Sequence, residues 1–98
     1  MEIMHLESAV QFNEVLKEKK VLVDFFATWC GPCRMLGPIL EKVESEIKVV
    51  KIDTDKFEDI ARDFGVMSIP TLVLLEDGRE IKRNVGFIDK HNLEKFLG

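Results

Sequence analysis

The chain has 98 residues, of which 46% are hydrophobic and 33% charged, as expected for one compact domain spanning residues 1–98. Its net charge of -4 is unfavourable for contact with phosphate backbones, so we expect no nucleic-acid partner. No apolar run is long enough to span a bilayer, and no basic, apolar leader opens the sequence, so we expect a cytoplasmic protein without a membrane partner.

The first part of the chain predicts a strand, a helix and a second strand. The first strand covers Ile3 to Leu6, and Ser8 with Gln11 forms a capping box at the start of the helix. We expect this helix to end in a basic cluster that complements its dipole, formed by Lys17, Lys19 and Lys20. Residues 21–27 are apolar apart from Asp24, which is typical of a central strand covered on both faces.

The middle of the chain predicts two helices on either side of a strand. The first helix runs from about Cys30 to Glu46 and is bent by Pro38. Its apolar spacing places three positions on the inner face: Leu36, either Ile39 or Leu40, and Val43. A strand over Val49 to Asp53 follows. Asp55 and Glu58 then form a capping pair for a helix that stops at Gly65.

The last part of the chain predicts a hairpin and a final helix. Strands over residues 71–75 and 80–85 flank a turn at residues 76–79, and Asp89 caps the helix. The order β-α-β-α-β-α-β-β-α predicts an α/β fold, in which helices cover both faces of a mixed central sheet.

The strongest chemical signal is the motif Trp29-Cys30-Gly31-Pro32-Cys33, located where the central strand ends and a helix begins. At helical spacing the two cysteine side chains are about 5 to 6 Å apart, close enough to form a reversible disulfide. Cys30 lies at the helix N-terminus, where the dipole favours a thiolate, whereas Cys33 lies one turn deeper. Pro32 suits the first turn because its missing N–H would have no partner there.

Two alternatives to redox chemistry are considered for the cysteines. They could be inert small hydrophobic residues, although a Gly-Pro turn at a strand end suits that role poorly. They could also form half of a zinc site, but zinc needs four ligands and only the distant His5 and His91 remain. We therefore expect both histidines to be surface residues and the protein to contain no metal.

Asp24 interrupts its apolar strand six residues before Cys30. A buried carboxylate is costly unless it is paired or protonated, so Asp24 has the character of a tuned proton acceptor. The alternative is an acid at a strand edge in contact with solvent. Lys51, on the strand expected beside it, is either its partner or a lysine that extends outward.

The segment before the hairpin also departs from a simple strand. Pro70 cannot donate a hydrogen bond to a sheet, so residues 66–70 are expected to form a functional loop that reaches the sheet. From the residues alone, the bond before Pro70 is expected to be trans, because cis bonds before proline are a small minority.

Taken together, these residues resemble the thioredoxin family over the whole chain. The resemblance is carried by these segments: 23–25, Ala27, 29–33, Lys51, Asp55, 69–71, the turn at 77–78, and Gly86. It implies the thioredoxin fold, a cis bond before a catalytic Pro70, and a substrate groove around Cys30. The groove would be formed by Trp29, Gly31, Pro32, Met67, Ser68, Ile69 and Gly86. Phe26 and Phe87 depart from the family's usual residues, which bears on substrate preference.

The resemblance further implies a monomeric protein-disulfide reductase without a bound cofactor. Cys30 would attack a target disulfide, Cys33 would resolve the mixed disulfide, and Asp24, tuned by Lys51, would accept the proton of Cys33. The implied partners are disulfide-containing target proteins and a thioredoxin reductase, linked to NADPH or ferredoxin. The alternatives are an oxidase or isomerase, or a redox-independent assembly module of the same fold.

Overall fold

Five strands and four helices follow one another in the order predicted from the sequence. The computed structural model describes residues 1–98. Its strands are β1 (Ile3–His5), β2 (Lys20–Phe26), β3 (Lys48–Asp53), β4 (Thr71–Glu76) and β5 (Arg79–Val85). Its helices are α1 (Ala9–Val15), α2 (Gly31–Lys42), α3 (Glu58–Asp63) and α4 (Lys90–Leu97). None of these helices has the length and apolar character needed to cross a membrane.

The strands form one mixed sheet in the order β1-β3-β2-β4-β5. β1, β3 and β2 are parallel, whereas β4 is antiparallel to β2 and β5 is antiparallel to β4. Parallel neighbours need a crossover, which explains why a helix separates each of the first three strands from the next. The prediction of a mixed sheet is confirmed, with β2 at its centre.

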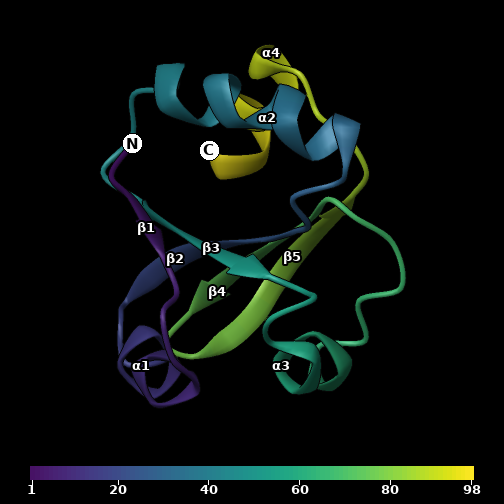
Figure 1. The fold of residues 1–98 in the computed structure, drawn as a ribbon. Helices are drawn as coiled ribbons and strands as arrows, with labels where there is room; N and C mark the ends of the chain where they lie inside the picture. The colour runs from purple at the N-terminus through teal and green to yellow at the C-terminus, as the bar shows by residue number, and fades with distance from the viewer.

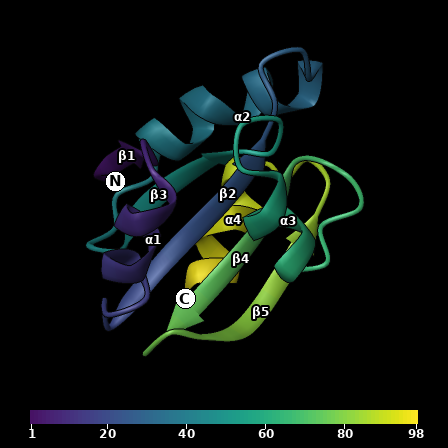
Figure 2. The same cartoon turned by 60° about the horizontal axis from the view of Figure 1, so that its bottom comes forward.

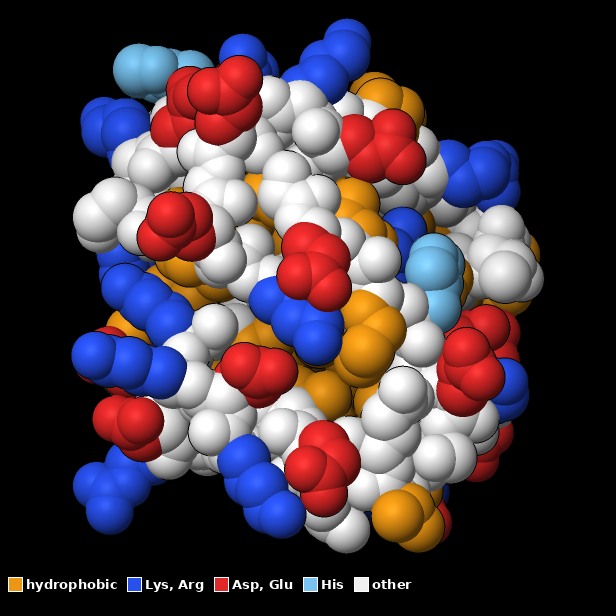
Figure 3. Space-filling view, turned by 90° about the vertical axis from the view of Figure 1, so that its left-hand side faces the viewer, with side chains coloured by type: hydrophobic (Ala, Val, Ile, Leu, Met, Phe, Trp, Pro, Cys, Tyr) orange, Lys and Arg blue, Asp and Glu red, His pale blue; other side chains and the backbone are white.

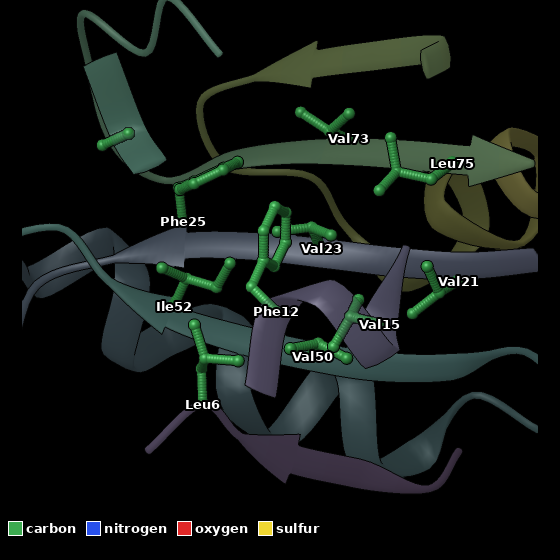
Figure 4. Close-up of a cluster of buried hydrophobic side chains, with 11 residues drawn as sticks. Leu6, Phe12, Val15, Val21, Val23, Phe25, Val50, Ile52, Val73 and Leu75 are labelled. Atoms are coloured by element: carbon green, nitrogen blue, oxygen red, sulfur yellow. The ribbon is translucent and has the colours of Figure 1, made fainter. Parts of the chain in front are cut away.

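Helices cover both faces of this sheet, as predicted. α2 and α4 lie on one face, and α1 and α3 lie on the other (Figures 1 and 2). Side chains along β2 alternate between the faces. Val21, Val23 and Phe25 belong to the core under α1 and α3, whereas Leu22 belongs to the core under α2 and α4. Figure 4 shows the first core, with side chains of α1 directed onto the strands.

Two helix ends differ from the prediction. α1 ends at Val15 with no basic residue in its last turn, so the lysine cluster follows the helix, and Lys20 is already in β2. α2 ends at Lys42 and not at Glu46. The reason is that Val43 is buried at 2% exposure with an extended backbone, which directs the chain toward β3. Of the two alternatives for the inner face, Leu40 is fully buried and Ile39 lies at the margin of the core.

The predicted helix caps are confirmed at two of three positions. The side chain of Ser8 accepts the N–H of Gln11, and that of Asp89 accepts the N–H of Asn92. The predicted pair of Asp55 and Glu58 is wrong, because α3 has Phe57 at its N-cap and no side-chain cap. Gly65, with φ of 65°, follows the end of α3 as expected.

The hairpin between β4 and β5 turns through Asp77 and Gly78, whose φ angles are 52° and 80°. Positive φ at both central residues matches the twist of antiparallel strands. A Cβ on Gly78 would lie 2.9 Å from the backbone oxygen of Leu16.

Gly78→Ala is therefore expected to lower the free energy of unfolding by about 1 to 3 kcal/mol. Gly37→Ala is the matched control, because Gly37 lies within α2 and a Cβ there meets no atom within 4 Å. This control is expected to raise stability by up to about 1 kcal/mol. Urea denaturation of both variants measures the effect, and a Gly78→Ala protein as stable as wild type would contradict the steric argument.

Charged side chains of both signs are interspersed on the face seen from the left of Figure 1, with small apolar areas between them (Figure 3). A surface of mixed sign produces no strong field of either sign. Contacts to this face are therefore expected to depend on local shape more than on net charge.

Candidate active site

The two cysteines lie at the N-terminus of α2, directly beyond the end of β2. Cys30 is the N-cap of this helix, and its Sγ accepts the backbone N–H of Cys33 at 3.2 Å. Pro32 lies in the first turn, where no helical hydrogen bond is lost. The first turn of the helix therefore directs the backbone N–H of Cys33 at the Cys30 sulfur, an arrangement that favours a thiolate.

Cys30 and Cys33 are joined by a disulfide, with their Cα atoms 5.2 Å apart. The bridge uses both cysteines of the chain, so neither sulfur is a free zinc ligand and neither is a mere hydrophobic filler. Both residues are buried, at 5% and 3% exposure. The arrangement indicates a dithiol that closes on itself when oxidised.

The loop before β4 lies against this pair. The bond between Ile69 and Pro70 is cis, as the family resemblance implied and the residues alone did not. The carbonyl oxygen of Ile69 is 3.9 Å from the Cys30 Sγ. Gly86 donates its N–H to the carbonyl of Pro70 at 2.7 Å, which ties the end of β5 to the same loop.

The surroundings of Cys30 are apolar and open. Trp29 is 68% exposed and Met67 is 96% exposed, while Ser68 and Pro32 are also at the surface. Ile69, Gly86 and Gly31 are partly exposed. Of the predicted groove residues, Ile69 lies against the disulfide, and Gly86 is tied to the same loop through the backbone of Pro70.

Trp29 is hydrogen-bonded to Asp55, the residue predicted to cap α3. Its Nε1–H donates to the Asp55 carboxylate at 2.8 Å. Asp55 therefore orients the indole and does not cap α3. A signal was present, because Trp29 follows β2 and Asp55 follows β3, and parallel strands bring their carboxyl ends to the same sheet edge.

Asp24 is buried at 1% exposure on β2, so the alternative of a solvated edge residue is wrong. Its Oδ2 lies 3.8 Å from the Nζ of Lys51, and its Oδ1 has no hydrogen-bond partner. Burial raises the pKa of Asp24 from 3.8 to about 6, and the positive charge of Lys51 opposes this rise. A carboxyl with this pKa can both take up and release a proton near neutral pH.

A pocket of about 270 Å³ connects this lysine with the inner cysteine. Its lining residues are Phe26, Ala27, Thr28, Cys33, Arg34 and Lys51. Arg34 donates to the carbonyl of Thr28 at 3.0 Å, which secures one wall. The pocket brings Lys51 and Cys33 to a common space, although they are far apart in the sequence.

Comparisons with known proteins agree over almost the whole chain. Residues 3–98 match the Thioredoxin family. A thioredoxin from Chlamydia muridarum is 44% identical, covering 97% of this chain and 96% of that protein. A thioredoxin from Bacillus subtilis is also 44% identical, covering 88% and 86% of the two chains.

Solved structures agree with this match. A mutant thioredoxin from Halobacterium salinarum superposes with a TM-score of 0.91 at 35% identity, covering 98% of this chain and 88% of that one. Together with the Cys30–Cys33 pair at the N-terminus of α2, these matches establish the family and the reaction class. The chain belongs to the thioredoxin family and is a thiol-disulfide oxidoreductase.

Proposed function

We propose that the protein reduces disulfides in target proteins, with Cys30 as the attacking thiol and Cys33 as the resolving thiol. The observation that carries the assignment is the position of Cys30 as N-cap of α2, next to the loop that contains Ile69. Cys33 instead lines the pocket that it shares with Lys51. A target sulfur therefore has its approach at Cys30, whereas Cys33 acts afterwards.

The reaction proceeds in two exchanges. The Cys30 thiolate attacks one sulfur of the target, the target S–S bond breaks, and the second target sulfur leaves as a thiolate and takes up a proton. Cys33 then loses its proton, its thiolate attacks the Cys30 sulfur, and the first target sulfur leaves. The target gains two electrons and two protons, and the Cys30–Cys33 disulfide holds the oxidising equivalents.

Asp24 is the proposed acceptor for the proton of Cys33, through a water molecule in the pocket beside Lys51. Burial supports this role, because it raises the pKa of Asp24 to about 6. A carboxyl with an ordinary pKa would bind the proton too weakly near pH 7.

The target is proposed to dock as an extended segment along the backbone of Ser68 and Ile69. This mode uses main-chain hydrogen bonds and reads shape more than sequence, which suits many different targets. Trp29, Met67 and Gly86 would contact the residues flanking the target cysteine. Pro70 ends this segment and is itself buried, directly before β4 begins.

Reduction of insulin disulfides tests the proposed function. The assay is run with an NADPH-linked and with a ferredoxin-linked thioredoxin reductase, and sustained turnover with one of them identifies the electron donor. Without turnover from either, net disulfide formation in a reduced substrate would indicate an oxidase, and rearrangement of substrate disulfides without net formation would indicate an isomerase. Full cellular activity of a Cys30→Ser, Cys33→Ser variant would instead indicate a redox-independent assembly module.

Alkylation of the reduced protein tests the assignment of the two thiols. Brief treatment with iodoacetamide at neutral pH is expected to label Cys30 much faster than Cys33, because the helix N-terminus stabilises the Cys30 thiolate. Mass spectrometry of the digested protein measures both sites. Equal labelling rates would contradict the proposed roles.

A monomeric state and a cytoplasmic location complete the proposal. Light scattering of the purified protein and fractionation of its native cells are the corresponding measurements. A stable dimer, or recovery outside the cytoplasm, would overturn these two points without affecting the redox chemistry.

A further inference from the structure

The pair of Asp24 and Lys51 has a third member, the aromatic ring of Phe26. The Nζ of Lys51 lies 4.7 Å from the centre of this ring and 3.8 Å from the Asp24 Oδ2. An ammonium group over a ring face at this distance is attracted by the negative face of the π-system. The lysine is therefore held from two sides.

The strand register explains how these groups meet. Asp24 and Lys51 are direct partners across β2 and β3, and Phe26 follows Asp24 by two residues on the same face of the sheet. Lys51 is itself opposite His5 across β3 and β1. The His5 ring meets the Phe26 ring edge-on, with centroids 6.1 Å apart, and so limits where the phenyl ring can turn.

Lysine needs such a restraint at this position. Its side chain is 14% exposed, and a flexible four-carbon stem allows the ammonium to move toward water if nothing opposes it. The distance to Asp24 is longer than a hydrogen bond, so the ion pair alone fixes the ammonium loosely. The ring face supplies the second contact.

We propose that Phe26 is a positioning residue, whose ring holds the ammonium of Lys51 beside Asp24. This inference rests on the role proposed above for Asp24 and adds a determinant of it. Phe26 also packs against the cluster of Ala27, Cys30 and Cys33, but in the proposed role it acts on Asp24 through the lysine. The ring thereby sets how strongly the positive charge favours the ionised form of the acid.

Other charged groups around Asp24 are few. β3 contributes Lys51, and β1 contributes His5 beyond it. β4 places the uncharged Leu72 opposite Asp24. From α2, Cys33 and Arg34 line the same pocket as Lys51. In the disulfide form Cys33 does not titrate, so Asp24 is the group to follow between pH 4 and 9.

The test is an NMR titration of the Asp24 side-chain carboxyl carbon in the oxidised protein. Phe26→Leu keeps an apolar side chain but removes the π face. We expect it to raise the pKa of Asp24 by about 0.5, since the lysine charge moves away. Lys51→Gln is expected to raise this pKa further, and Phe26→Trp is expected to keep it near the wild-type value.

The decisive measurement combines the variants. In a Lys51→Gln background, Phe26→Leu is expected to leave the pKa of Asp24 unchanged, because the ring has no ammonium to hold. An equal rise in both backgrounds would overturn the proposal and show that Phe26 acts by burying Asp24. No rise in either background would overturn it as well.

Two controls complete the design. Phe57→Leu removes the ring of a second lysine–aromatic pair, with Lys56 at 5.5 Å, and is expected to leave Asp24 unaffected. In the wild-type protein, the ε-methylene protons of Lys51 should show a ring-current shift caused by the Phe26 ring. This measurement does not depend on whether any variant folds. Absence of the shift would contradict the contact between Lys51 and Phe26. If these shifts appear while the thiol exchange rate does not follow the pKa of Asp24, the fault lies with the proposed role of Asp24.

Discussion

Cys33→Ser is expected to abolish turnover and to leave the protein covalently joined to its substrate. Without the resolving thiol, the mixed disulfide at Cys30 has no intramolecular route to release. Cys30→Ser is expected to lose turnover too but to form few adducts, because Cys33 lines the pocket shared with Lys51 and is not the helix N-cap. The Cys33→Ser variant is therefore expected to accumulate mixed disulfides with the substrate, and the Cys30→Ser variant is not.

Insulin incubated with each variant on non-reducing gels measures this difference. The adduct of the Cys33→Ser variant should disappear on treatment with dithiothreitol, which identifies it as a disulfide. The Cys30→Ser, Cys33→Ser double variant is the matched control and should form none. Equal trapping by the two single variants would mean that either sulfur can meet the target, and the assigned roles would be wrong.

Asp24→Asn is expected to stabilise the protein at alkaline pH and to slow its second exchange. The pKa of Asp24 is raised by burial from 3.8 to about 6, so the folded protein binds this proton more tightly than the unfolded chain does. Its contribution to stability is therefore full below the unfolded pKa and is lost as the pH rises through the folded pKa. Above that range the ionised, buried carboxylate lowers the free energy of unfolding.

The size of this destabilisation follows from the same pKa. Raising it from 3.8 to about 6 corresponds to roughly 2 to 3 kcal/mol at pH 8, since a tenfold change in proton affinity is worth about 1.4 kcal/mol. Urea denaturation from pH 4 to 9 should show the gain of Asp24→Asn shrinking as the pH falls from about 7 to 4. Asp63→Asn, an exposed change on α3, should stay within about 0.5 kcal/mol of wild type.

The kinetic half of the prediction concerns the release of the target. General base assistance is typically worth about 10²-fold or more, so the second exchange in Asp24→Asn should slow by that order while the first is little changed. Stopped-flow measurement of mixed-disulfide decay separates the two steps. A variant less stable than wild type at pH 8, or one as fast in the second exchange, would show that Asp24 does not have the proposed role.

Local chemistry explains why much of the fold could be predicted. Ser8 and Asp89 cap their helices with hydrogen bonds made within three residues, and Asp77-Gly78 has the φ angles that its turn requires. Helix ends that depend on distant partners could not be predicted. Val43 leaves α2 because its side chain is buried between layers, and Asp55 is engaged by Trp29 from another strand end.

The same division applies to the site. Cys30 and Cys33 stand out through their spacing, and Asp24 through the cost of an acid in an apolar strand. The sequence leaves open whether Lys51 lies beside Asp24, because a lysine on a strand can point to either face, and the structure places the two groups 3.8 Å apart. The ring of Phe26 under that lysine depends on side-chain geometry across two strands, which sequence patterns do not encode.

The alternation of side chains along β2 makes the sheet a partition between two cores that can change independently. The core under α1 and α3 and the core under α2 and α4 have no side chain in common, and Asp24 shares its face of β2 with the second. Substitutions in the first core, around Phe12 and Val23 (Figure 4), can therefore change the stability of the protein without altering the face that carries Asp24. Thermal tolerance and redox chemistry can be adjusted by different sets of residues in so short a chain.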